Sequence, residues 1–319
     1  MNGEKRGSPI GRGPLTRRQV NRGLSAAGLS AMGLGLAGCA RRAAGCDSIG
    51  GEAQAALNDA IDGLGGDRAI GAEPTLSAFD IYLSPHPDDV CFSLGILASL
   101  SGAGTLITVF SKSSFISEPI SLSGNSAARA QRVTAIRTAE DRRFAAAAGL
   151  RFMRLGFLDA PLRGRFAFDG SHAIQDAEII ENPLLFAMNQ LAAGRPAGLR
   201  PWLFCPMGIG GHADHLAVRW AVLRNLTQLR STYQIGFYED LPYASKWRLR
   251  LKGLASFDCG WGGRPLRRHS LYLGANLQRK LDLVRIYTSQ FRRLPTTIER
   301  FSPARMLPSS PHEGLWIEA

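Results

Sequence analysis

The stretch YLSPHPDDVCFSLGILASL, residues 82–100, joins a strand-like apolar run to a helix-like apolar run through a short polar turn. Pro85 and Pro87 stiffen this turn, which also holds His86, Asp88 and Asp89. A strand-to-helix turn needs one aspartate to cap the first helical N–H groups, and capping does not require the histidine. The turn therefore favours one edge of a metal site over a simple cap.

Short apolar runs alternate with longer helical patterns along the rest of the chain. Strands are expected at 79–84, 105–111, 151–157, 202–206 and 233–240, with helices at 90–102, 126–149, 177–194 and 212–226. This alternation is typical of a parallel sheet covered by helices. The pattern predicts an α/β protein with a Rossmann-like layered, mostly parallel sheet and helices on both faces.

A second polar stretch, CPMGIGGHADHLAVRW, residues 205–220, follows the expected strand at 202–206. In open parallel sheets ligands bind at the carboxyl ends of strands, so this stretch and the first turn can converge. His212 and His215 are three residues apart, and on a helix both imidazoles would project to the same side. The two stretches together predict one metal centre.

Catalytic zinc usually takes three protein ligands and leaves one position for water. His86, Asp89 and His215 would supply two nitrogens and one carboxylate to one zinc ion per chain. Asp88 and His212 would remain beside the ion, where a hydrolase needs a base and an acid. A dinucleotide-binding protein is disfavoured because SPHPDD contains no glycine that would let a pyrophosphate approach.

The motifs PHPDD and GHADH resemble the two metal motifs of the LmbE-like, or PIG-L, family of zinc-dependent de-N-acetylases. The stretches RTAEDRRFAAAAG, GFLDAPLR, FYEDLPYA and YTSQ extend the resemblance over about residues 79–300. Members of this family deacetylate N-acetylglucosaminyl compounds and have a Rossmann-like sheet. The resemblance implies a zinc-dependent amidohydrolase that removes acetyl groups from an N-acetylated amino sugar or related glycoconjugate.

The resemblance also implies roles for individual residues. His86, Asp89 and His215 would bind zinc and Asp88 would be the general base. His212 would stabilise the oxyanion or protonate the leaving amine. Asp214 would orient His212 or support His215, and the sequence does not choose between these. The chain departs from the family pattern at Val90 and Ala213, where many members have glutamate and proline, which affects the tuning of the site.

Five further residues are candidates for substrate binding, each with a structural alternative. For Arg137 the default expectation is a surface ion pair with Glu140 one turn away, and Asp159 could equally cap a turn at a strand end. Tyr238, Glu239 and Asp240 end the last expected strand with an aromatic and acidic group suited to sugars, or form an ordered loop.

The first residues have the features of an export signal. LTRRQVNRGLSAAGLSAMGLGLAGCA contains an arginine pair, a weakly apolar stretch and small residues directly before Cys39. The sequence predicts a signal with a lipoprotein box at 1–38, lipidation of Cys39, a flexible tether at 39–77 and a deacetylase domain at 78–319. The protein would be exported and lipid-anchored to a bacterial membrane, by the twin-arginine or the general route.

The charge of the chain is strongly basic, with 38 Lys and Arg against 26 Asp and Glu, a formal net charge of +12. The arginine-rich stretches SKWRLRLKG and RPLRRHS match no nucleic-acid motif, so no nucleic-acid partner is predicted. Two functions from different classes remain, the deacetylase and a catalytically silent glycan-binding lipoprotein of the same fold. The deacetylase is favoured because a binding module has no need of a base beside three metal ligands.

Overall fold

The structure is a computed structural model that describes residues 74–117, 126–305 and 309–318. These residues fall within one compact unit, residues 42–319. The predicted signal, the lipidation site Cys39 and nearly all of the predicted tether lie outside the described residues. Within the described part of the chain, no helix is long and apolar enough to span a membrane.

The centre of the molecule is a seven-stranded sheet with the order β3-β2-β1-β4-β5-β7-β6. The first five of these strands in the sheet are parallel, and β7 runs antiparallel to both β5 and β6. The strands are β1 (Ile81–Ser84), β2 (Thr105–Thr108), β3 (Arg151–Arg154), β4 (Trp202–Pro206), β5 (Gln234–Tyr238), β6 (Leu266–Tyr272) and β7 (His312–Glu318). The predicted mostly parallel α/β sheet is thereby confirmed.

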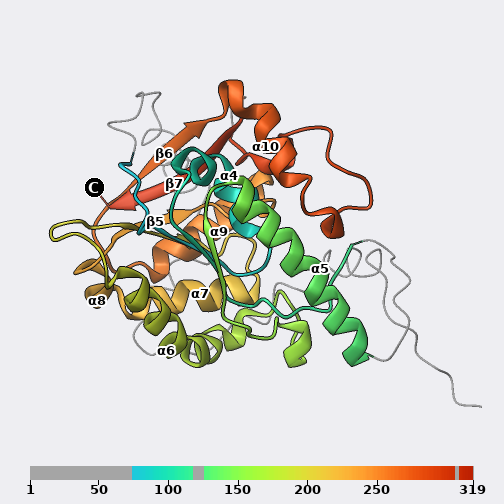
Figure 1. The fold of residues 1–319 in the computed structure, drawn as a ribbon, viewed down its shortest axis with the longest axis horizontal. Helices are drawn as coiled ribbons and strands as arrows, with labels where there is room; N and C mark the ends of the chain where they lie inside the picture. The colour runs from blue at the N-terminus through green and yellow to red at the C-terminus, as the bar shows by residue number, and fades with distance from the viewer. Residues whose placement is uncertain (1–73, 118–125, 306–308, 319) are drawn as a thin grey trace, which may run out of the picture. The chain divides into compact units, whose positions relative to one another are not determined.

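Helices connect the strands and cover the sheet. They are α4 (Asp89–Ser101), α5 (Ser126–Ala147), α6 (Ala173–Ala192), α7 (Ala213–Arg224), α8 (Leu226–Arg230), α9 (Trp247–Gly260) and α10 (Leu277–Val284). Short 3-10 turns include η1 (Pro161–Arg163), η2 (Gly170–His172) and η3 (Tyr243–Ser245). Helix α4 packs on α10, and α6 packs on α7, with the two pairs on opposite sides of the strands (Figure 1).

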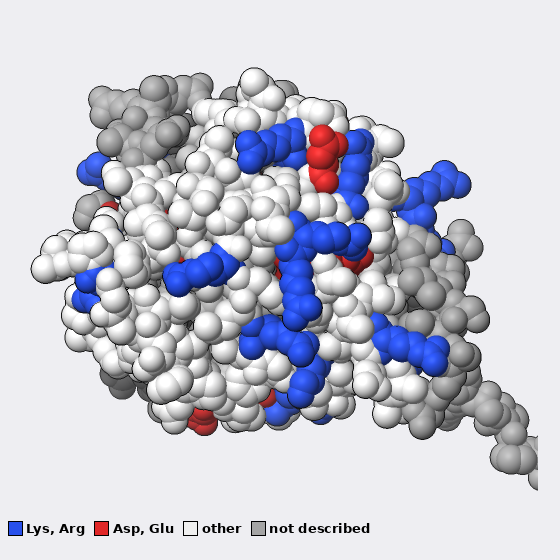
Figure 2. Space-filling view, viewed as in Figure 1, with Lys and Arg blue, Asp and Glu red and all other residues white. Residues whose placement is uncertain are grey.

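The core follows from the apolar character of the central strands. Every residue of β1, β2 and β4 is buried, as expected where helices cover both faces of a parallel sheet. On the face shown in Figure 2, basic side chains are spread over a largely uncharged surface and acidic ones are few, in line with the positive net charge.

The last two strands are absent from the pattern read from the sequence. Strand β6 is only partly buried, and β7 pairs antiparallel between β5 and β6, which ends the parallel part of the sheet. Its stretch HEGLWIE carries two acidic residues, yet most of it is buried. Glu313 is buried and Glu318 is partly buried, and each pairs with a basic residue of a distant element, Lys280 and Arg230 respectively, which a local pattern does not reveal.

Helix α4 is interrupted at Leu94, whose φ of −129° is not helical. The interruption leaves backbone N–H groups without helical acceptors, and the Glu313 carboxylate of β7 accepts from Ile96 N at 2.8 Å and Leu97 N at 2.9 Å. Lys280 of α10 pairs with Glu313 and donates to the carbonyl of Cys91 at 3.1 Å. The helix that begins with the first motif is thus completed by side chains from the C-terminal part of the chain.

Candidate functional site

The two motifs meet where the strand order reverses. Strands β1 and β4 are parallel neighbours, but the chain continues from β1 to β2 on one side and from β4 to β5 on the other. Such a reversal opens a crevice at the carboxyl ends of the two strands, and ligands bind there in α/β sheets. The turn at 85–88 leaves β1 at this crevice, and the loop at 207–212 leaves β4 beside it.

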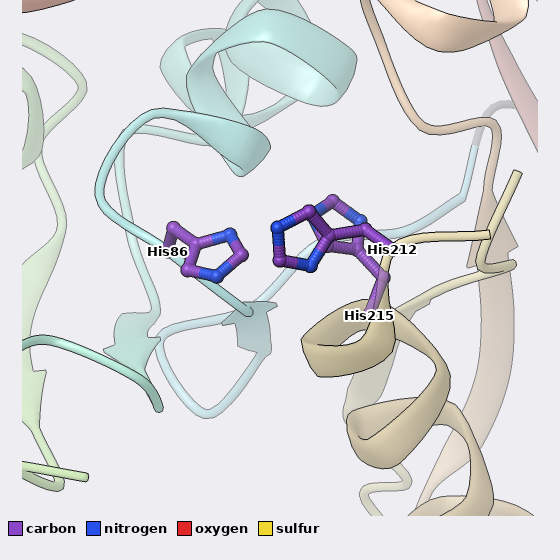
Figure 3. A group of neighbouring side chains, drawn as sticks. All are labelled: His86, His212 and His215. Carbon is purple, nitrogen blue, oxygen red and sulfur yellow. The ribbon is translucent and has the colours of Figure 1, made fainter. Parts of the chain in front are cut away.

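Three histidines from the two motifs lie together at this edge. His86 comes from the turn after β1, while His212 and His215 come from the start of α7 (Figure 3). One ring nitrogen from each of the three lies within 4.8 Å of the others, and all three side chains are buried. Because one nitrogen of each ring lies close to the other two, the three residues form a candidate metal centre.

Asp89 lies between two of these imidazoles. Its Oδ2 atom is 3.3 Å from His86 Nδ1 and 3.3 Å from His215 Nε2. Two ligands that bind one zinc ion tetrahedrally at 2.0–2.1 Å are separated by about 3.3–3.4 Å. Asp89 Oδ2 thus lies at the distance from each imidazole nitrogen that two ligands of one tetrahedral zinc ion would have.

The outward nitrogen of each of these imidazoles is held by another carboxylate. His86 Nε2 lies 2.7 Å from Asp214 Oδ2, and His215 Nδ1 lies 2.7 Å from Asp240 Oδ1. In the neutral tautomer whose outward ring N–H donates to the carboxylate, the inward nitrogen has a free lone pair. This carboxylate–histidine arrangement is the one that fixes ring orientation in metal sites.

The electrostatics agree with a site built for a cation. Burial opposes charge on His86, but hydrogen bonds to Asp214 and Asp89 raise its pKa to about 9. Burial likewise opposes ionisation of Asp89, but its neighbour His215 lowers the Asp89 pKa well below the usual value. The carboxylates therefore stabilise positive charge at the inward nitrogens, where a metal cation could replace protons.

His212 differs from the other two histidines. It is the N-cap of α7, and its Nδ1 atom accepts a hydrogen bond from Asp214 N at 3.2 Å. Burial, together with the neighbouring His86 and His215, lowers the pKa of His212 well below its usual value. His212 is therefore a neutral imidazole with its proton on Nε2, which is a hydrogen-bond donor rather than a charged acid.

Asp88 has an unusual backbone for a residue with a side chain. Its φ is 117°, the single positive φ of a non-glycine residue among those the structure describes. Arg137 donates to the preceding carbonyl of Pro87 at 2.7 Å and to Asp88 Oδ2 at 3.3 Å. Burial raises the pKa of Asp88 to about 8, against the lowering effect of Arg137. The result is a buried carboxylate with high proton affinity beside the candidate metal centre.

Asp214 has partners that the sequence did not indicate. Its carboxylate binds His86 rather than His212 or His215, and it also accepts from Arg163 at 2.7 Å and from Ala160 N at 3.0 Å. Neither predicted alternative included the carboxylate contact to His86, because His86 is 128 positions away in the sequence. Asp214 contacts His212 through its backbone N–H, which donates to His212 Nδ1. Arg163 is thus bound to the outer side of the centre.

The predicted substrate-binding residues are mostly turned into the protein. Tyr238 donates its hydroxyl hydrogen to the carbonyl of Leu83 at 2.8 Å, and the buried Glu239 binds Arg250 and Arg268. Asp240 holds His215, and Asp159 caps η1 by accepting from Leu162 N at 3.1 Å. These contacts give Tyr238 and Glu239 no support as direct substrate ligands.

Arg137, the remaining predicted substrate residue, is buried on α5. Besides its contacts to Pro87 and Asp88, it donates to Ser113 Oγ at 3.1 Å. It does not form the predicted surface ion pair with Glu140, whose carboxylate binds Ser289 and Thr288. Arg137 therefore reaches the site through Asp88.

Aromatic side chains line one side of the centre. Tyr243 of η3 is edge-on to His215 with ring centroids 5.9 Å apart, and Phe168 is edge-on to His212 at 5.5 Å. The Tyr243 ring lies against Gly210, where φ is +98° and an added Cβ would be 2.5 Å from the ring. Glycine is required at this position of the GIGG loop by both the backbone and the close ring contact.

Comparisons with known proteins agree with this description. The chain is 36% identical over 171 residues to the 2'-N-acetylparomamine deacetylase of Streptomyces fradiae, a match that spans 52% of this chain and 58% of that protein. The match thus covers less than two thirds of the relative. No family model matches the chain.

Solved deacetylases have the same fold. A deacetylase of teicoplanin biosynthesis superposes with a TM-score of 0.52 at 19% identity, covering 74% of this chain and 96% of that one. A zinc-inhibited form of teicoplanin deacetylase gives a TM-score of 0.51 at 18% identity with the same coverage. At these identities the likeness concerns the fold alone.

Proposed function

We propose that the protein is a zinc-dependent N-deacetylase of the LmbE-like, or PIG-L, type that acts on an N-acetylated amino sugar or related glycoconjugate. The observation that carries the proposal is the position of Asp89 Oδ2, which lies 3.3 Å from both His86 Nδ1 and His215 Nε2. The similarity to the 2'-N-acetylparomamine deacetylase supports an acetylated amino sugar as the substrate class.

His86, Asp89 and His215 are the residues that would hold zinc, with Asp214 and Asp240 orienting the two imidazoles. When bound, zinc supplies a Lewis acid that polarises the acyl oxygen and lowers the pKa of water. The donor set of two imidazoles and one carboxylate is one that catalytic zinc commonly takes.

Asp88 is the general base in this proposal. Hydrolysis needs water to lose a proton as its oxygen bonds to the acetyl carbon, and the Asp88 carboxylate can accept that proton. Burial raises the pKa of Asp88 to about 8, which increases its proton affinity, although a nearby cation would reduce this effect. Arg137 holds the carboxylate in place.

His212 completes the set as a neutral donor. Its Nδ1 accepts from the backbone of Asp214, so the hydrogen on Nε2 can stabilise the oxyanion that forms at the acetyl oxygen. When the C–N bond breaks, the amine takes up the proton that Asp88 accepted, and acetate and the free amine leave. Of the two predicted roles of His212, the tautomer favours oxyanion stabilisation.

Acetate release from a panel of N-acetylated amino sugars tests the proposal, together with zinc content. Asp88→Asn should lower acetate release by about a hundredfold or more, the usual contribution of a positioned base, while zinc content and melting temperature stay unchanged. A normal rate with normal zinc would exclude the base role. Loss of zinc together with the rate would instead make Asp88 a ligand. A glycan-binding protein without activity would bind the sugars and release no acetate.

Zinc content of three single variants separates the two possible ligand sets. His86→Ala and His215→Ala should each lose most of the zinc, whereas His212→Ala should keep it and lose activity. Zinc loss in His212→Ala at the level of the other two would favour the three-histidine set instead.

We also propose that the protein is exported and anchored through a lipid on Cys39. The support is the sequence LAGC after a weakly apolar stretch that follows an arginine pair. Cys39→Ser should move the protein from the membrane fraction to the soluble fraction or leave it unprocessed. Unchanged fractionation would refute the anchor.

A further inference from the structure

Two phenylalanines beside the candidate metal centre remain exposed to solvent. Phe166 is 60% exposed and Phe168 is 42% exposed, and their ring centroids are 6.1 Å apart. Phe168 is edge-on to His212 and lies 6.0 Å from the ring of Tyr243. We call Phe166 and Phe168 the aromatic pair. Phe168 thus borders the imidazole of His212, which Figure 3 shows at the start of α7.

The segment that carries the aromatic pair is fixed to α7. Ala213 N donates to the carbonyl of Ala167, between the two phenylalanines, at 2.8 Å. Farther back, Ala160 N and the Arg163 guanidinium both bind the Asp214 carboxylate of α7. The same helical turn therefore positions His212 and the aromatic pair, which places the Phe168 ring at a set distance from the reacting groups.

Exposed phenylalanine rings at a polar site leave apolar area in water until a ligand covers it. From the exposed rings and their neighbours, we propose that the aromatic pair binds the apolar C–H face of the substrate's sugar rings. This inference rests on the proposed function and names how that site selects its substrate. Phe168 takes the ring whose acetamido group reaches His212, and Phe166 takes the adjoining ring.

The flanking residues suit a sugar better than an acyl chain. Charged residues flank the aromatic pair in the sequence: Arg165 pairs with Asp176 at 3.2 Å, and the exposed Asp169 accepts from Ser171 N at 3.0 Å. A long acyl chain would require an enclosed apolar channel. The apolar cavity of about 190 Å³ near Arg163 has no imidazole of the metal centre among its described lining residues. The aromatic pair covers one face of a ligand and leaves the other face to solvent, as a glycan requires.

The test uses N-acetylglucosamine, N,N'-diacetylchitobiose and 2'-N-acetylparomamine with the zinc-loaded protein. The readouts are KM and kcat for acetate release and, independently, the dissociation constant from ligand-observed NMR. Phe168→Ala should raise KM and the dissociation constant about tenfold for all three sugars, with kcat nearly unchanged. Phe168→Tyr should restore both values, and Phe168→Leu should not.

Two further variants complete the design. Phe166→Ala should weaken binding of the two-ring sugars and leave N-acetylglucosamine unaffected. Phe186→Ala is the matched control, since Phe186 is 67% exposed on α6 and lies 13 residues, about 20 Å of helix, beyond the helix start at Ala173. It should change neither constant.

Each outcome decides the inference. Unchanged KM and binding in Phe168→Ala, or equal losses in Phe186→Ala, would overturn it. Sugar binding that depends on Phe168 without any acetate release would support the aromatic pair and reject the proposed function. Absence of both binding and acetate release with all three sugars would overturn the two together.

Discussion

Two regions of the molecule bury charged side chains, and their hydrogen bonding differs. In the arginine cluster, formed by Glu239, Arg250 and Arg268, one oxygen of Glu239 accepts from Arg250 Nε at 2.6 Å and the other from Arg268 Nε at 2.7 Å. In the candidate metal centre, two imidazole nitrogens instead face Asp89 Oδ2 at the longer distance of 3.3 Å.

The comparison shows that buried charge alone does not mark a functional site. The carboxylate of the arginine cluster is satisfied by the protein itself, since Trp316 Nε1 also donates to Glu239 at 2.9 Å. In the candidate metal centre, the inward nitrogens of His86 and His215 lie 3.3 Å from Asp89 Oδ2. The carboxylates of Asp214 and Asp240 bind the outward nitrogens of the same two rings. The site is distinguished by ligand atoms that are held in fixed positions and remain able to bind a metal ion.

The largest expected effect comes from Glu239→Gln, which removes the charge between two buried arginines. Breaking a buried ion pair on one side costs about 3–5 kcal/mol of unfolding free energy. Urea unfolding measures this cost, and KM and zinc content should not change in the folded protein. A raised KM without lost stability would instead return Glu239 to the substrate-binding residues that the sequence suggested.

A smaller effect is expected from Asp214→Asn, which weakens the carboxylate that orients His86. Loss of such a partner typically lowers metal affinity about 10–100-fold. Competition with a chelator at fixed pH measures the zinc affinity. Asp176→Asn is the control, because Asp176 binds the same arginine, Arg163, at 2.9 Å. Equal losses in the two variants would mean that Asp214 acts through Arg163.

The smallest expected effect is a pH dependence of stability at the edge of the arginine cluster. Burial, and then Arg268, lowers the pKa of His312 from 6.5 to about 4. Between these values the unfolded chain binds a proton that the folded protein does not, so the unfolding free energy falls as pH falls. At pH 5.5 the loss relative to pH 7 is about 1 kcal/mol for this residue.

The comparison with His312→Asn isolates this contribution, since asparagine does not titrate. Unfolding by urea at pH 7 and pH 5.5 should show the additional loss in the wild-type protein and not in the variant. Equal pH dependence of both proteins would show that His312 keeps an ordinary pKa in the fold.

Much of the fold could be predicted because the parallel strands are local apolar runs. The strands at β1 and β4 and the helices that follow them coincide with the sequence pattern to within a few residues. Strands β6 and β7 were not predicted because their charged residues obtain partners only in the folded sheet. For example, Arg268 of β6 binds Glu239 of the loop after β5.

The site could be predicted less completely than the fold. The motif spacing indicated which histidines lie at the strand ends, because that depends on local geometry. The partner of Asp214 and the inward direction of Tyr238 depend on contacts over more than a hundred residues of sequence. The exposed Phe168 carried no sequence signal of its own, since a single phenylalanine in a polar loop is compatible with many positions.

The interruption of α4 has a consequence for how the site assembles. The Glu313 carboxylate accepts hydrogen bonds from Ile96 N and Leu97 N across 217 and 216 positions of the chain. The helix that begins at Asp89 is therefore complete only when the C-terminal strand has docked. Contacts between residues so far apart in the sequence slow folding. They also join the first motif and the last strand in one cooperative transition. A chain cleaved before β7 would then lose not one strand alone but also the order of the turn that carries the candidate metal ligands.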